Sequence, residues 1–208
     1  MQYRGSGRLA QALGPMTRIC VGPLPQSPEF HPRELGWVQL REGSPMRAQL
    51  TAFPIGIGIL GLLYFAWVTW APAAVILPDS VLGRLGALFC VIVVHELLHA
   101  VAHPGLGLSS DTCLGFWPKQ ATCYAHYVGA MPRNRLIVVL LLPLLLISLA
   151  PLLLSIALSM PIPYGAFVSP ANGLLACVDV LGVGLLAVQV PPSAVVRNQG
   201  WVTWWHGA

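Results

Sequence analysis

The sequence predicts an all-α membrane protein with about four transmembrane helices, a small β-hairpin between the second and third spans, and a β-like tail at the C-terminus. Composition is the first reason: 56% of the 208 residues are hydrophobic and 9% are charged, whereas soluble globular domains carry about 25% charged residues. The spacing of the charges is the second. Residues 48–78 and 136–178 contain none, and about 20 apolar residues suffice for one helix to cross a bilayer.

The first 46 residues are expected to form a basic, Pro- and Gly-rich cytoplasmic tail that is partly disordered, followed by a membrane domain over residues 47–208. Six arginines precede residue 53. We do not expect them to bind nucleic acid, because basic residues also mark the cytoplasmic side of a membrane protein. No apolar stretch of the length found in a signal peptide occurs here, so no signal peptide is expected, and Met16 or Met46 could be the true start.

Four apolar spans are expected, at residues 53–77, 85–102, 136–158 and 170–190. A short turn at 78–84 separates the first two, and the Pro- and Gly-containing segment 160–165 separates the last two. Residues 103–135 are mixed in composition and predict a β-hairpin or loop that turns near 117–119. In the tail, 191–208, two extended runs around residues 198–200 indicate a hairpin at the membrane surface, with tryptophans at the interface.

Positive charge fixes the expected orientation. It lies in three regions: the N-terminal tail, the loop between spans two and three, and the C-terminal tail. The loop carries Lys119, Arg133 and Arg135, and the C-terminal tail carries Arg197. The two remaining turns hold only Asp79 and Arg84. We therefore expect a multi-pass protein in contact with the lipid of the inner (cytoplasmic) membrane, with both termini in the cytoplasm.

The most informative motif is His-Glu-Leu-Leu-His at residues 95–99, inside the second span. On a helix, residues four apart lie one turn apart on the same face, so the imidazoles of His95 and His99 can bind one metal ion. Glu96 then lies beside a metal-bound water, where it can act as a general base. Polar groups are costly among apolar side chains unless they are paired or bound to a metal, so the motif predicts a zinc peptidase site.

A catalytic zinc usually has three protein ligands and a water, so one ligand remains to be found. Asp179 is the first choice, because it and Glu96 are the only acidic residues within the apolar spans. His103 and His126 are alternatives: His103 continues the series of histidines at i+8, and His126 could reach in from the mixed segment. Asn172 precedes Asp179 by two helical turns and could contact substrate or hold a ligand, or could cap the helix at its entry into the span.

The five cysteines do not form the close Cys-x-x-Cys pairs of a zinc ribbon or a redox motif. They are expected to be small apolar residues with free thiols. A disulfide between Cys113 and Cys123 across a turn is the alternative.

These motifs resemble a family of bacterial membrane proteins, the putative zincin peptidases, which are polytopic and related to the site-2 protease type of intramembrane zinc metalloproteases. The resemblance rests on four features, which are His-Glu-Leu-Leu-His-Ala at 95–100, Gly-Phe-Trp-Pro-Lys at 115–119 with the run to Tyr127, Arg133-Asn-Arg followed by an apolar span with Leu142-Pro143, and Asn172 followed by Asp179. It implies a Zn²⁺ site made of His95, His99 and Asp179, catalysis by Glu96, and proteolysis at or in the membrane.

The expected function is therefore that of a membrane-embedded zinc metallopeptidase that acts on membrane or membrane-proximal proteins. Its substrates could include transmembrane segments. Asn172 and His126 are candidates for contacts with the substrate or the oxyanion. The strand-like segment at 115–128 could pair with an unwound substrate. A non-enzymatic zinc-binding or zinc-transporting membrane protein is the alternative, and Glu96 discriminates between them, because a transport site does not need an unligated carboxylate beside the metal.

Overall fold

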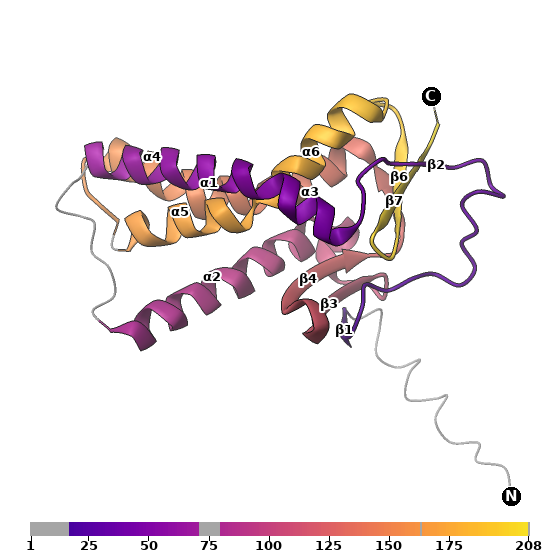
Figure 1. The fold of residues 1–208 in the computed structure, drawn as a ribbon, viewed down its shortest axis with the longest axis horizontal. Coiled ribbons are helices and arrows are strands. Elements are labelled where there is room, and N and C mark those ends of the chain that lie inside the picture. Colours follow the sequence, from indigo (N-terminus) through magenta and orange to yellow (C-terminus); the bar gives the residue numbers. More distant parts are fainter. Residues whose placement is uncertain (1–16, 71–79, 163, 208) are drawn as a thin grey trace, which may run out of the picture.

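A computed structural model describes residues 17–70, 80–162 and 164–207. The long helices lie together, and the labelled strands gather at one end of them (Figure 1). Helices α1 (Pro45–Trp70) and α2 (Val81–Ala102) and the continuous stretch Arg133–Leu158 are each long and apolar enough to cross a membrane, and a bent helix pair makes a fourth if it counts as one span. The predicted class, helical with small β elements and about four spans, is confirmed to this extent.

Both of the first two helices begin earlier than the sequence predicts. Helix α1 starts at Pro45 rather than residue 53, because Ser44 caps it by accepting a hydrogen bond from the Arg47 N–H (3.4 Å). Helix α2 starts at Val81 rather than 85, because Ser80 Oγ accepts from the Gly83 N–H (3.0 Å). It ends at Ala102, as predicted, two residues before Pro104. The predicted end of span one and the first two residues of the turn after it, together residues 71–79, lie outside the described residues.

The last two spans contain irregular backbone. The third consists of α3 (Arg133–Pro143), a π-helical segment (Leu144–Leu149) and α4 (Ala150–Leu158). The fourth was predicted as one helix over 170–190 and this is wrong: α5 (Gly165–Leu175) and α6 (Cys177–Gln189) meet at a 49° bend. The bend lies at Ala176, whose ψ of 7° departs from the helical value.

Small residues bring α1 close to α5 and to the first residue of α6. A Cβ atom added to Gly56 of α1 would lie 2.8 Å from Cys177 Cβ, and one added to Gly173 of α5 would lie 2.7 Å from Leu63 Cδ1. Close approach through glycine is typical of helix interfaces in membranes, where dispersion contacts replace the hydrophobic effect. This contact fixes the position at which α6 begins.

Two small sheets cover the end of the helices where α1 begins and α2 ends. The first has the order β1 (Arg18–Val21), β3 (Thr112–Trp117), β4 (Thr122–Tyr127), so the predicted hairpin is confirmed, with its turn in a short 3-10 helix at Pro118–Gln120. A second 3-10 helix, Pro104–Gly107, follows α2. A disulfide joins Cys20 to Cys113. The alternative pairing of Cys113 with Cys123 is therefore wrong, as is the expectation that all five thiols are free.

The second sheet has the order β2 (Val38–Gln39), β7 (Val202–His206), β6 (Val195–Gln199), β5 (Ala130–Pro132). Strands β6 and β7 form the predicted C-terminal hairpin. Strands β1 and β2 come from the segment expected to be a tail, of which residues 1–16 lie outside the described part. A core of buried residues, among them Leu136, Val139 and Leu186, joins this sheet to α3 and α6, and it holds both helices beside the candidate site.

Candidate metal centre

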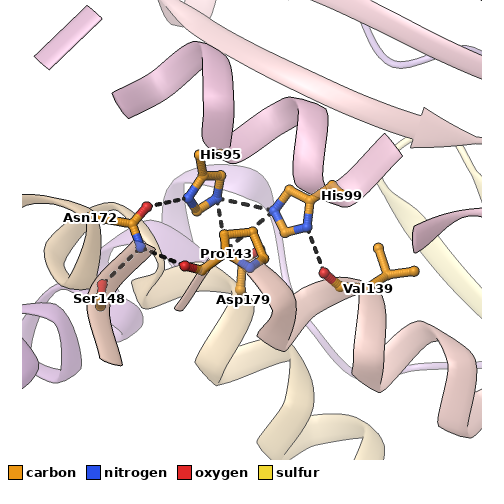
Figure 2. A network of polar contacts seen from close by, with 7 residues as sticks. All are labelled: His95, His99, Val139, Pro143, Ser148, Asn172 and Asp179. Atoms are coloured by element: carbon orange, nitrogen blue, oxygen red, sulfur yellow. Dashed lines mark hydrogen bonds and ion pairs between the residues drawn. The ribbon is translucent and has the colours of Figure 1, made fainter. Parts of the chain in front are cut away.

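His95 and His99 project from one face of α2 into the interior, and each is only 6% exposed. Their rings meet nearly edge-on, with centroids 4.7 Å apart and the two Nε2 atoms 3.0 Å apart. Figure 2 shows the two rings side by side, above Asp179. The pair predicted from the four-residue spacing is therefore formed.

The hydrogen bonds on the far sides of the rings determine which nitrogens carry protons. His99 Nδ1 lies 2.7 Å from the Val139 carbonyl oxygen, which can only accept, so this nitrogen is the donor. The amide nitrogen of Asn172 donates to the Pro143 carbonyl (3.0 Å) and to Ser148 Oγ (2.9 Å), which leaves its Oδ1 to accept from His95 Nδ1 at 2.8 Å. In the neutral rings both Nε2 atoms are thus unprotonated, and their lone pairs face each other.

Asp179 completes the group from α6, 84 residues along the chain from His95. Its Oδ2 lies 3.2 Å from His95 Nε2 and 3.5 Å from His99 Nε2. Asp179 occupies the first turn of α6, where the helix dipole favours a carboxylate.

These three atoms fit a metal ion. Ligand atoms about 2.0–2.1 Å from a tetrahedral zinc lie about 3.3 Å from one another, and the three separations here are 3.0, 3.2 and 3.5 Å. Two imidazole nitrogens and a carboxylate oxygen are also a donor set that zinc commonly takes. Among the described residues, His95, His99 and Asp179 are the one group that meets the geometric conditions for a metal site.

Glu96 lies beside this group and is not part of it. Its carboxylate accepts a hydrogen bond from the backbone N–H of Ala125 in β4. Both residues line a cavity of about 660 Å³ that also contains the three ligands and extends to α1 and β7. A water or peptide in this cavity can thus approach the ligands and Glu96 together.

His103 and His126 line the same cavity but lie outside the ligand group. His103 caps the C-terminus of α2, its Nδ1 lies 3.5 Å from Thr112 Oγ1, and its ring contacts that of Tyr127 at a tilt of 43°. His126 hydrogen-bonds the Pro25 backbone, and its buried Nε2 has no partner among the described residues. Burial lowers the pKa of each to about 4, so both are neutral at pH 7. The structure thus favours Asp179 over either of them as the third ligand.

Asn172 has a position that the sequence did not predict. It lies inside α5 and is fully buried, so the helix-cap interpretation is wrong. Its amide connects His95 to Ser148, whose hydroxyl donates to the Ser169 carbonyl (2.9 Å). Ser148 and Ser169 were missed, although a serine within an apolar span is itself a signal, because such a group must find a partner.

The comparison with protein families agrees with this geometry. A family described as "Putative zincin peptidase" matches residues 88–195, just over half of the chain, including the two histidines, Glu96, Asn172 and Asp179. No curated protein and no solved structure gives a match.

Proposed function

This chain belongs to the putative zincin peptidase family, and from that premise we propose that it is a membrane-embedded zinc metallopeptidase that hydrolyses peptide bonds in membrane or membrane-proximal proteins. One observation carries the proposal. Two imidazole Nε2 atoms and a carboxylate oxygen converge at the spacing of zinc ligands, and a second carboxylate, that of Glu96, lies beside them in the same cavity.

In the proposed reaction the protein holds the reacting groups in place and moves protons. A bound Zn²⁺ would supply a Lewis acid that polarises the scissile carbonyl and acidifies water. Glu96 accepts the proton of the attacking water and later gives it to the leaving amine. Its hydrogen bond with Ala125 holds the carboxylate at the cavity wall, and the partners of His95 and His99 hold their Nε2 atoms toward the position that a bound metal would occupy.

Strand β4 is suited to hold an extended substrate. It ends its sheet, so its outer edge has no strand partner among the described residues. The Val128 N–H donates to the Asp111 carbonyl (3.0 Å). Because inward and outward bonds alternate along an antiparallel pair, the backbone of Ala125 faces away from β3 and toward Glu96. A transmembrane substrate, once unwound, can satisfy its free backbone groups along this edge.

The end of the helices that carries the strands is proposed to face the cytoplasm. The basic residues that predicted the orientation lie there: Arg135 donates to the Ala102 and His103 carbonyls at the end of α2, and Arg197 donates to the Val128 carbonyl. Basic residues are retained on the cytoplasmic side. Both termini and the mouth of the cavity would then be cytoplasmic.

The test is the metal content and activity of the purified protein against a generic unfolded substrate. Wild type should bind about one zinc per chain and cleave. Glu96→Gln should keep the zinc and lose hydrolysis, because a base is not a ligand. Glu34→Gln, a matched change at an exposed acidic residue, should keep both the zinc and the hydrolysis. Full activity of the Glu96 variant would overturn the mechanism. A wild type that binds zinc and cleaves nothing would favour the non-enzymatic zinc-binding or zinc-transporting protein.

A further inference from the structure

A third carboxylate lines the cavity and has no part in the proposed chemistry. Glu42 lies between β2 and α1, and its Oε1 and Oε2 accept hydrogen bonds from the backbone N–H (2.5 Å) and the hydroxyl (3.2 Å) of Thr203 in β7. Each carboxylate oxygen has two lone pairs, so both oxygens keep accepting capacity. The rest of the surrounding wall is largely apolar, with Leu40, Ala48 and Phe53 among its residues.

Within the described part of the chain, no Lys or Arg lies among the residues that line the cavity, and no ion pair is found at Glu42; those at the cavity join the two metal-site histidines to Asp179. Burial raises the pKa of Glu42 to about 7, which reflects the cost of an unpaired charge in this place. A cation that entered the cavity would therefore find a preformed partner.

An aromatic residue lies next to Glu42. Trp201 lines the same cavity, and its indole N–H donates to the carbonyl of Gly43, the residue that follows Glu42 (3.1 Å). An indole ring beside a carboxylate is a favourable environment for an ammonium or guanidinium group.

We propose that Glu42, with Trp201 beside it, forms a binding subsite for a Lys or Arg side chain of the substrate, and so determines which proteins are cleaved. The inference rests on the proposed peptidase function and adds its substrate class. Glu42 lies three residues before α1 begins, at the end of the helices that is proposed to be cytoplasmic, and the metal ligands lie within the helices. Membrane segments carry Lys and Arg on their cytoplasmic flank, so a substrate whose apolar part reaches Glu96 brings its basic flank to Glu42.

The test uses purified, zinc-loaded protein and peptides that differ at one position, where Lys, Met or Glu is placed in turn at each site flanking the scissile bond. At one such position wild type should cleave the Lys peptide with a kcat/KM about tenfold above that of the Met peptide, and the Glu peptide most slowly. Glu42→Gln, whose amide oxygen can still accept from Thr203, should abolish the difference between Lys and Met by slowing cleavage of the Lys peptide more than that of the Met peptide. Glu42→Lys should favour the Glu peptide, and Glu34→Gln should behave as wild type.

Two results would overturn this inference and leave the peptidase function intact. The first is a wild type with no preference for Lys at any position. The second is an equal loss of activity of Glu42→Gln on all three peptides, which would make Glu42 a structural support for Thr203. The comparison of the three peptides on wild type needs no variant. A missing preference for Lys would therefore overturn the inference even if the substitutions prevent folding. A wild type that cleaves none of the peptides would instead refute the proposed function, and the subsite with it.

Discussion

The amide of Asn172 orients His95 in the metal site, and its removal gives a specific prediction. Asn172→Ala deletes the acceptor for His95 Nδ1 and the donor to the Pro143 carbonyl and to Ser148 Oγ. The partner that orients a metal-bound histidine typically contributes 10–100-fold in metal affinity, or about 1.4–2.8 kcal/mol. His99 is oriented by a backbone carbonyl, that of Val139, so Asn172 is the one orienting side chain that mutation can remove.

A second substitution separates orientation from folding. Asn172→Asp keeps an acceptor for His95 Nδ1 but cannot donate to the Pro143 carbonyl. We expect it to hold zinc more tightly than Asn172→Ala, and yet to unfold at a lower temperature than wild type, since a buried carbonyl without a donor costs about 1–3 kcal/mol. Asn134→Ala, a matched change at an exposed position, should alter neither property.

The assay is zinc competition against a chromogenic chelator, together with thermal unfolding of the metal-free protein. The metal-free measurement separates general destabilisation from loss of the ligand's orientation. A zinc affinity of Asn172→Ala within threefold of wild type would refute the reasoning. So would equal affinities for the Ala and Asp variants, because the acceptor would then have no effect on the metal.

Four further outcomes are expected. Asp179→Ala should weaken zinc binding strongly in metal analysis and Asp179→His should restore part of it, because imidazole is also a zinc ligand; unchanged zinc in the Ala variant would exclude this residue. His103→Ala and His126→Ala should each retain zinc, and loss in either would reopen the choice of third ligand. The preference for Lys should fall as the pH drops through about 7, because Glu42, on which only burial and Thr203 act, becomes neutral; a ratio of rates that does not change with pH would contradict this. Reporter fusions should place both termini in the cytoplasm, and an external signal would reverse the orientation.

The local part of the site could be predicted from the sequence because it depends on helical spacing and on the cost of polar groups in apolar surroundings. The four-residue spacing placed His95 and His99 on one face. Asp179 followed from the scarcity of acidic residues in the spans. The argument for Asn172 assumed one continuous helix, whereas the structure places Asn172 and Asp179 on two helices separated by the bend. Both contact His95, but because of the bend and not because they share one helix face.

Contacts between segments distant in the chain could not be predicted. Strand β1 pairs with β3, and the disulfide joins residues 93 positions apart. Neither feature has a local signature, because a four-residue strand is too short for a periodic pattern and the spacing of cysteines does not determine their pairing. The burial of Glu42 could likewise not be predicted, because it depends on Thr203 of β7, which lies at the other end of the sequence.

The irregular backbone of the last two spans has a common location. Pro143 and the π-helical segment after it lie where Asn172 and Ser148 meet, and the bend at Ala176 lies between Asn172 and Asp179. Irregular backbone at membrane depth is tolerated only where other groups satisfy it or where it lines a cavity. Here the Pro143 carbonyl is satisfied by Asn172, and the bend starts a new helix whose first turn carries Asp179. The irregular segments that a prediction of continuous spans misses are thus the ones that bring Asp179 and Asn172 to the histidines of α2.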